Sequence, residues 1–421
     1  MYLSRVYDSI LKQRLEAKDA ILIEGPKWCG KTTTAKQVAG SVLYMQDPDT
    51  RERNRQLAEM RPMFLLEGAT PRLIDEWQEA PVLWDAVRFE ADKRQEFGQF
   101  ILTGSTVPPD TGEMMHTGTG RIGRMRMRPM SLFESEDSTG AVSLGGLFRG
   151  EELPIASAPS GIDELAFLVC RGGWPRAAGA SERVALRQAY DYLDAIVESD
   201  ISRVDGIERD PNKARAVMRS YARFTASQGK VSQMIADLER SDEGPSDKTV
   251  RTYLDALKKL FVVEELPAWN PNLRSKAAIR STPTRHFTDS SIGVAALGTN
   301  PRGLIQDLET FGLLFESMCI RDLRVYMDRL DGFVSHYRDS SGLECDAVAH
   351  LRDGAYGLIE IKLGGRRLIE EGAASLKTLA KTIDTSKMGK PAFLMVLTGS
   401  DDMSYPREDG VLVVPIRTLA P

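Results

Sequence analysis

Short apolar runs separated by helical patterns fill the first third of the chain. The runs at residues 20–23, 72–76 and 99–105 are short and largely apolar, which predicts buried strands. Between them, residues 32–39 and 84–94 show the spacing of helices. Since strands that alternate with helices form parallel sheets, this part of the chain predicts an α/β domain.

A second pattern, mainly helical, covers the middle of the chain. Residues 134–160 are rich in Gly, Ser and Pro and predict a loop-prone boundary before it. Helices are then predicted at residues 163–203, 217–225, 231–238 and 247–260, with a turn at 241–245 and a strand at 262–266. This order is typical of a winged helix, whose second helix enters a DNA groove. The alternative is a winged helix that only packs against neighbouring domains.

Two strands near the C-terminus predict a β-hairpin. They cover residues 343–351 and 356–363 and are joined by a short loop that ends in glycine. In this register Asp346 lies opposite Glu360, and Lys362 joins them on the same face. Further elements of this region are helices predicted at residues 311–326 and 368–383 and a strand at 391–397.

Length and composition place the chain among multidomain globular proteins. Its 421 residues are too many for one core, and 42% of them are hydrophobic and 27% charged. We expect an α/β multidomain protein with domains at residues 1–150, 151–278 and 279–421. The net charge of −5 does not indicate nucleic-acid binding, although a local basic surface is compatible with it.

The sequence contains no pattern for a membrane segment, a zinc site or a disulfide framework. No apolar stretch is long enough to span a bilayer, and the charged N-terminus lacks the apolar core of a signal peptide. We therefore expect a cytoplasmic protein with no membrane partner. The four cysteines, Cys29, Cys170, Cys319 and Cys345, lie far apart, and the histidines form no cluster.

The segment after the first strand matches a phosphate-binding loop. Residues 25–32 read GPKWCGKT, the pattern G-x-x-x-x-G-K-[ST] between a strand and a helix. Glycine lets the backbone curve around phosphates, Lys31 would reach the β- and γ-phosphates, and Thr32 would hold Mg²⁺. The predicted nucleotide-binding residues are Gly25, Pro26, Lys27, Trp28, Cys29, Gly30, Lys31, Thr32, Thr33 and, further along, Asp75.

Two acids at the end of the strand at residues 72–76 supply the other groups that hydrolysis needs. Asp75 would bind Mg²⁺, directly or through water, and Glu76 would polarise the attacking water. The strand at residues 99–105 ends in small polar residues. Thr103 or Ser105 would contact the γ-phosphate through its hydroxyl, and the alternative is an ordinary strand exit.

Arginine and methionine alternate after Ile122. This period of two predicts a strand with arginines on one face. We expect Arg121, just before it, to stabilise transition-state charge on the nucleotide, either in its own subunit or in a neighbouring subunit of a homo-oligomer. The remaining arginines are expected on a solvated edge strand.

The C-terminal hairpin combines acids and a lysine in a pattern typical of metal-dependent phosphodiester chemistry. Asp346, Glu360 and Glu316 on the preceding helix would bind Mg²⁺, which lowers the pKa of a bound water and stabilises charge on the scissile phosphate. Lys362 would position the nucleophile or neutralise charge. The alternative is a salt-bridged strand face with no catalytic role.

These motifs resemble those of prokaryotic AAA+-type ATPases in which a nucleotide domain precedes a C-terminal module of undefined function. The resemblance extends over the whole chain and implies ATP rather than GTP as the nucleotide. The chain departs from the pattern at residues 27–29, where many relatives carry an arginine and smaller or polar residues. The matching segments are residues 25–33, 73–76 with Gln78, 102–105, 120–121, 129–134 and 172–175.

The C-terminal order of elements resembles a second group, the PD-(D/E)XK restriction-endonuclease-like fold. Asp346 falls at the metal-binding Asp of that group, and residues 360–362 fall at its E-x-K. We therefore expect Mg²⁺-dependent ATP hydrolysis coupled to DNA binding or processing, with a nuclease centre in the C-terminal domain. One alternative is an ATP-dependent switch that binds DNA or protein without cleavage. Another is a regulatory assembly protein with no nucleic-acid role.

Overall fold

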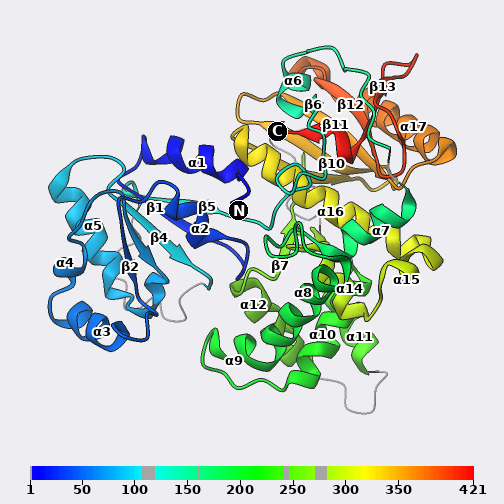
Figure 1. The fold of residues 1–421 in the computed structure, drawn as a ribbon. Helices are drawn as coiled ribbons and strands as arrows, with labels where there is room; N and C mark the ends of the chain where they lie inside the picture. The colour runs from blue at the N-terminus through cyan, green and yellow to red at the C-terminus, as the bar shows by residue number, and fades with distance from the viewer. Residues whose placement is uncertain (1, 107–118, 160, 240–245, 271–281) are drawn as a thin grey trace. The chain divides into compact units, whose positions relative to one another are not determined.

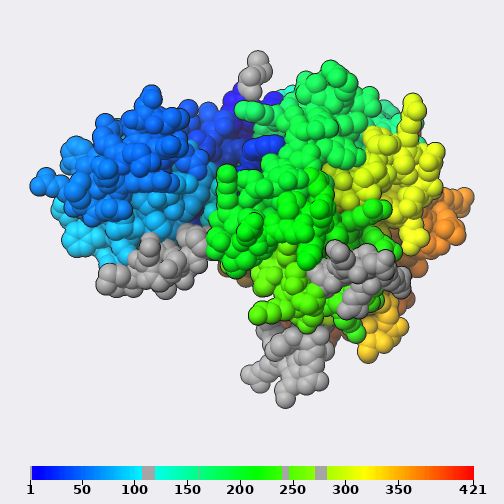
Figure 2. All heavy atoms as spheres, turned by 90° about the horizontal axis from the view of Figure 1, so that it is seen from below, coloured from blue at the N-terminus to red at the C-terminus, as the bar shows by residue number. Residues whose placement is uncertain are grey.

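The computed structural model describes residues 2–106, 119–159, 161–239, 246–270 and 282–421. The chain divides into two compact units (Figure 1). The first contains Met1–Pro129, Glu198–Asp210 and Asp255–Val262, and the second contains Met130–Val197, Pro211–Leu254 and Val263–Pro421. Figure 2 draws all heavy atoms, with the residues outside the described ranges in grey.

The domain boundaries expected at residues 150 and 278 stay predictions. Residues 130–150 belong to the second unit, together with much of the C-terminal half of the chain. The other boundary falls among residues 271–281, which lie outside the described residues.

A parallel sheet with the order β2-β3-β4-β1-β5 forms the centre of the first unit. All four neighbouring pairs are parallel, which confirms the predicted α/β architecture. One strand, β4, lies between the strand that precedes the glycine-rich loop and the strand that ends in Asp75. The strands are β1 (Ala20–Glu24), β2 (Ser41–Tyr44), β3 (Arg72–Asp75), β4 (Phe100–Gly104) and β5 (Ile122–Arg126).

Apolar side chains from this sheet and from the helices beside it form one core. Leu22, Ile74 and Leu102 contribute from the strands, and the rings of Trp77 and Trp84 lie 5.0 Å apart within the same cluster. The helices are α1 (Val6–Leu15), α2 (Lys31–Lys36), α3 (Arg51–Met60), α4 (Pro62–Leu65) and α5 (Val82–Arg94). The helix predicted at residues 32–39 is thus shorter than expected and ends at Lys36.

The second unit contains a mixed sheet with the order β13-β14-β12-β11-β10-β9. Strands β11, β12 and β14 are parallel, and the other neighbouring pairs are antiparallel. The predicted hairpin is confirmed as β10 and β11, with Ala347 opposite Ile359. The strands are β9 (Gly332–Arg338), β10 (Glu344–Leu351), β11 (Tyr356–Lys362), β12 (Phe393–Thr398), β13 (Tyr405–Pro406) and β14 (Leu412–Pro415).

Two long helices pack on this sheet. Helix α17 (Arg366–Thr382) contributes Ile369, Ala373 and Leu376 to the core that it shares with the sheet. Helix α16 (Leu308–Arg329) packs against β9, β10 and β11 and is buried along most of its length. No helix within the described ranges is both long enough and apolar enough to cross a lipid bilayer.

The predicted helices of the middle region are present, but the one expected at residues 163–203 is interrupted. Gly172 has a left-handed φ of 69°, and a Cβ on Gly173 would lie 2.0 Å from the carbonyl oxygen of Met130, so the chain turns here. The elements are α7 (Ile162–Arg171), α8 (Glu182–Ala195), a π turn (Ile196–Asp200), α9 (Ile201–Arg203), α10 (Pro211–Arg223), α11 (Val231–Glu239), α12 (Asp247–Lys259), and antiparallel β7 (Val263–Leu266) and β8 (Thr284–Phe287).

Two other expectations for this region need comment. The turn predicted at residues 241–245 lies outside the described residues. The boundary predicted as a loop at residues 134–160 contains β6 (Val142–Ser143) and α6 (Leu144–Phe148). Short elements form here because Val142, Leu144 and Leu147 are buried, and the Ser143 hydroxyl accepts a hydrogen bond from the Gly146 amide at the start of the helix.

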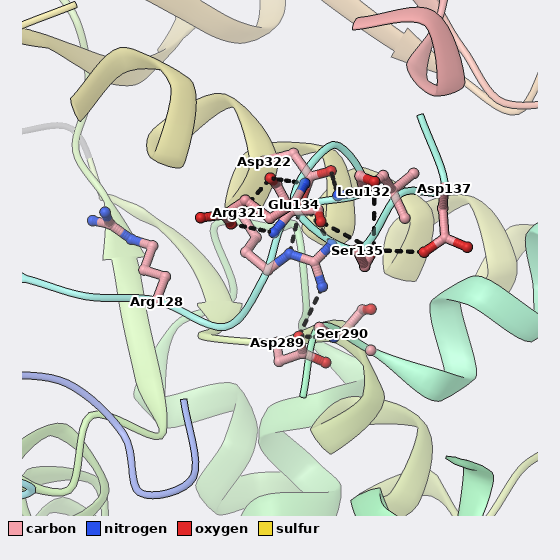
Figure 3. A network of polar contacts seen from close by, with 12 residues as sticks. Arg128, Leu132, Glu134, Ser135, Asp137, Asp289, Ser290, Arg321 and Asp322 are labelled. Carbon is pink, nitrogen blue, oxygen red and sulfur yellow. Dashed lines mark hydrogen bonds and ion pairs between the residues drawn. The ribbon is translucent and has the colours of Figure 1, made fainter. Parts of the chain in front are cut away.

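A buried ionic network holds the second unit together around α16 (Figure 3). Arg321 lies 2.8 Å from Asp289 and 2.6 Å from Asp322, and all three side chains are buried. The carboxylates also accept backbone bonds, from Gly173 N to Asp289 at 2.8 Å and from Leu132 N to Asp322 at 2.9 Å. The segments 129–134 and 172–175, which matched the family pattern, therefore meet at this network.

Replacing Arg321 by methionine is expected to lower the free energy of unfolding of the second unit by about 3–5 kcal/mol, because two buried carboxylates lose their counter-ion. Urea unfolding would measure the change. The matched control is Arg367→Met, since that side chain is 85% exposed in its pair with Glu371 and an exposed pair contributes about 0–1 kcal/mol. Equal unfolding midpoints for the two variants would contradict the assignment.

Candidate functional site

Two glycines shape the loop between β1 and α2. Gly30 precedes α2 with a φ of 101°, a conformation that favours glycine. Gly25 follows β1 directly, and a Cβ at this position would lie 2.1 Å from the carbonyl oxygen of Met127. The loop can therefore lie against the chain that leaves β5 only because residue 25 has no side chain.

Lys31 lies inside the curve of this loop. Its ammonium donates hydrogen bonds to the carbonyl oxygens of Gly25 at 2.9 Å and Pro26 at 2.8 Å, and the residue is buried. A phosphate oxygen is a stronger acceptor for an ammonium than a neutral carbonyl. Lys31 is therefore the cation of this loop that is suited to phosphate.

Asp75 joins the loop to the neighbouring strands. Its Oδ1 accepts hydrogen bonds from the hydroxyls of Thr32 and Thr103, both at 2.6 Å. Strand β4, which carries Thr103, lies between β1 and β3, so the three side chains meet at the carboxyl ends of these strands. A hydroxyl and a carboxylate are oxygen ligands of the kind that Mg²⁺ uses together with substrate phosphates.

Glu76 extends the same hydrogen-bonded group. Its carboxylate Oε2 accepts bonds from the Ser105 hydroxyl at 3.0 Å and from the Gln78 amide, and its backbone amide donates to Thr103 Oγ1 at 3.3 Å. Ser105 thus contacts the predicted water-activating acid. Contact of Thr103 or Ser105 with a γ-phosphate stays a prediction.

The other predicted loop residues point in different directions. Lys27 pairs with Asp200 at 2.7 Å, Trp28 is 47% exposed with a φ of 66°, and Thr33 is exposed on α2. Cys29 is buried, and its Sγ lies 3.7 Å from the Met127 carbonyl oxygen. These four side chains lie on the outside of the loop or in its packing, so their contribution to nucleotide binding through backbone amides stays a prediction.

Of the two alternatives for Arg121, action on the nucleotide of its own subunit does not fit the structure. In the parallel register Ala20 pairs with Ile122 and Glu24 with Arg126, so Arg121 lies at the end of the sheet opposite the glycine-rich loop. Four residues of strand separate the two ends by about 13 Å. The Arg121 guanidinium instead pairs with Asp92. Action in a neighbouring subunit stays a prediction.

Three further residues lie near the loop, and two of them, Arg5 and Asp200, had no signal in the sequence. Arg5 donates to the carbonyl oxygens of Cys29 at 2.7 Å and Arg128 at 2.9 Å and is buried. Asp200 reaches Lys27 across 173 residues of sequence. Arg126 lies at the loop end of β5, 3.8 Å from Glu24. Only the alternating arginines pointed to one of them, and that pattern does not say which arginine lies at which end of the sheet.

The structure also brings together the charged residues that were predicted to converge in the second unit, Asp346, Glu360 and Lys362. Lys362 Nζ lies 3.1 Å from Asp346 Oδ2 and 2.6 Å from Glu360 Oε2. Asp346 Oδ2 accepts a further bond from the Ile361 amide at 2.7 Å. The ammonium therefore bridges the two carboxylates and acts as their counter-ion.

The acids around Lys362 outnumber it, since Glu316 lies near Asp346 and Glu360 as well. Burial, followed by the charge of Asp346, raises the pKa of Glu360 to about 8, and burial and Asp346 likewise raise the pKa of Glu316. Although burial acts to lower it, Asp346 and Glu360 hold the pKa of Lys362 well above its ordinary value. Three carboxylates thus share one ammonium, and they destabilise one another's charged form.

Glu316 and Asp346 line a cavity of about 100 Å³ within the second unit. Ser227, Thr284 and His336 also line it. Among the described residues, no group of three His, Cys, Asp or Glu side chains has the arrangement of a metal site. In this structure Lys362 lies where a cation would neutralise Asp346 and Glu360, so a metal at these residues would have to displace it.

Replacing Arg5 by methionine is expected to weaken ATP binding by about tenfold, because the carbonyls of Cys29 and Arg128 lose a buried donor worth about 1–3 kcal/mol. Titration calorimetry would measure the dissociation constant. Arg14→Met is the matched control, since Arg14 lies on α1, which begins directly after Arg5, and donates to the Arg124 carbonyl from an exposed position. An unchanged affinity in Arg5→Met would show that the two hydrogen bonds of Arg5 do not shape the loop for ATP binding.

Comparison with known proteins divides the chain into three parts. Residues 17–136 match the family described as an AAA domain, residues 162–303 match a domain of unknown function, DUF8612, and residues 311–419 match another, DUF4143. No curated protein matches the sequence.

Two solved structures illustrate distant similarity. A Walker-type ATPase of Pyrococcus abyssi is 14% identical with a TM-score of 0.42, over 70% of this chain and 96% of that one. The Hef helicase domain of Pyrococcus furiosus is 11% identical with a TM-score of 0.19, over 94% of this chain and 89% of that one. The match of residues 17–136, together with the loop geometry above, identifies this part of the chain as an AAA-like P-loop ATPase domain.

Proposed function

We propose that this chain hydrolyses ATP with Mg²⁺ at the loop of the first unit and couples hydrolysis to DNA binding or processing. One observation carries the first part of this proposal. Asp75 Oδ1 accepts the hydroxyls of Thr32 and Thr103 at 2.6 Å each, next to Glu76. This arrangement supports the proposal, because Asp75, its two hydroxyl partners and Glu76 lie together at one edge of the sheet.

Each residue has a defined task in this proposal. Lys31 binds the β- and γ-phosphates, and Thr32 and Asp75 hold Mg²⁺, which neutralises charge on the phosphate oxygens when bound. Glu76 accepts a proton from the attacking water as the new oxygen–phosphorus bond forms and the bond to the β-phosphate oxygen breaks. Thr103 orients Asp75. Arg121 would add positive charge only from a neighbouring subunit.

Lys31→Ala is expected to abolish tight ATP binding, because the loop loses the ammonium that is proposed to bind the β- and γ-phosphates. Glu76→Gln should bind ATP as the wild type does and lose about 10²–10⁴-fold in turnover, since the amide cannot accept the proton. Phosphate release and nucleotide titration would separate the two effects. Lys36→Ala, on the exposed side of the same helix, is the control. Normal turnover by Glu76→Gln would refute the role of Glu76.

A second activity is proposed for the C-terminal group of acids. We propose a nuclease centre of the PD-(D/E)XK type, because Asp346, Glu360 and Lys362 converge from a hairpin beside a helix that carries Glu316. Asp346, Glu360 and Glu316 would hold Mg²⁺, which would activate a water molecule. Lys362 would leave its bridging position and neutralise charge at the scissile phosphate.

The same contacts support the binding alternative. If Lys362 keeps its place between the two carboxylates, the domain would bind DNA or protein without cleavage. The order of α10, α11, α12, β7 and β8 fits the proposed winged helix. On α12, however, Arg251 pairs with Asp247 at 2.8 Å and Lys259 lies 3.5 Å from Asp205, so part of its positive charge is already neutralised. DNA contact through α12 would therefore be weak and sensitive to salt.

Mg²⁺-dependent cutting of single-stranded, double-stranded or branched DNA, with ATP present, is expected for the wild type. Asp346→Ala and Lys362→Ala should each lose about 10²-fold or more in cleavage, as expected for groups that bind metal or act on the reacting phosphate. Lys377→Ala is the control, because Lys377 forms a similar pair with Asp409 at 2.6 Å outside this group.

Three outcomes of this assay distinguish the candidate functions. Absence of wild-type cutting on all substrates would remove the nuclease activity. Nucleotide-dependent DNA binding without cutting would favour the switch or binding protein. No DNA binding, or binding that does not change with salt, would favour an assembly protein with no nucleic-acid role.

A further inference from the structure

The carboxylate of Glu76 is held through one oxygen only. Both the Ser105 hydroxyl, at 3.0 Å, and the Gln78 side-chain amide donate to Oε2. Within the described part of the chain, Glu76 Oε1 accepts no hydrogen bond. A carboxylate held in this way has a fixed direction and one oxygen left for a further donor.

The backbone at Glu76 adds to this fixed direction. Glu76 has a φ of 56°, in the left-handed region that a glutamate rarely adopts. A 3₁₀ turn, Trp77–Glu79, follows at once and brings the Gln78 side chain back toward Glu76. Such a conformation costs energy and persists where surrounding contacts determine it. The turn therefore presents Glu76 and Gln78 together.

Gln78 is itself packed tightly against β4. Its Oε1 is buried without a hydrogen-bond partner, and a Cβ on Gly104 would lie 3.2 Å from that oxygen. Glycine at residue 104 thus makes room for the Gln78 amide, and the next residue is Ser105. Ser105, directly after β4, therefore donates one hydrogen bond to Glu76, and Gly104 at the end of β4 leaves room for the second donor, Gln78.

We propose that Gln78 and Ser105 are positioning residues for water activation by Glu76. The inference rests on the proposed ATP hydrolysis and extends it to two residues that act through Glu76. Their bonds to Oε2 turn Oε1 toward the attacking water, which then gives its proton to Oε1. A base that is displaced by about 1 Å from its productive position loses about 10²-fold in rate.

Gln78→Leu and Ser105→Ala test this role directly. Each variant is expected to lose about 10²-fold in kcat with the KM for ATP and the dissociation constant unchanged. Ser105→Thr keeps a hydroxyl and should restore most of the rate. Gln46→Leu is the matched control with wild-type turnover, because Gln46 also donates to a glutamate, Glu79, at 3.0 Å but from an exposed position.

Double variants that combine Gln78→Leu or Ser105→Ala with Glu76→Gln distinguish a positioning role from general damage to the active site. In single-turnover experiments, neither Gln78→Leu nor Ser105→Ala should slow the Glu76→Gln enzyme further, because the group that they orient has lost its function. A further loss of the same size in that background would overturn the proposal. Wild-type kcat in both single variants would overturn it as well.

The controls separate this proposal from the function on which it rests. If the wild type binds but does not hydrolyse ATP, the proposed hydrolysis fails. If the wild type hydrolyses ATP and the two single variants match it, only the positioning role fails. If Gln78→Leu no longer binds ATP, Ser105→Ala decides the question, since it removes a single oxygen atom.

Discussion

The arrangement of side chains beside the glycine-rich loop depends on one carboxylate oxygen, Asp75 Oδ1. Asp75 Oδ1 accepts both the Thr32 and the Thr103 hydroxyls, which join segments 43 and 28 residues away in the sequence. β4 lies between β1 and β3, so the Thr103 bond joins β4 to the strand that carries the acids, and the Thr32 bond joins the start of α2 to the same strand. The position of Glu76, one residue further on, follows from the same two bonds.

The two groups of acids in this chain differ in how their charge is balanced. Asp75 is held by neutral hydroxyls, so its negative charge is available to a divalent cation beside a triphosphate. Asp346 and Glu360 instead share the ammonium of Lys362. A metal ion at Asp346 and Glu360 must therefore compete with Lys362. For this reason ATP hydrolysis is better supported than DNA cleavage.

Not every segment that matched the family pattern belongs to a reactive site. Residues 129–134 and 172–175 meet through a bond from Met130 N to Gly173 O of 2.6 Å and are tied to Asp322 and Asp289 of the buried network. Unpaired charges are costly inside a protein, so this network requires all of its members. These segments hold the second unit together, whereas residues 25–32 and 72–76 lie in the first unit, at or after its strands β1 and β3.

The sequence by itself determined the elements and the contacts that depend on local geometry. Apolar runs predicted β1, β3 and β4, and a three-residue loop set the register that brings Asp346 to Glu360, because a hairpin loop fixes its own pairing. Only the tertiary structure decided which end of the sheet Arg121 occupies, and that Arg5, Asp200 and Ser105 reach the loop and its acids. Those contacts join residues far apart in sequence, and they follow from the order of parallel strands and from packing, neither of which has a local signal.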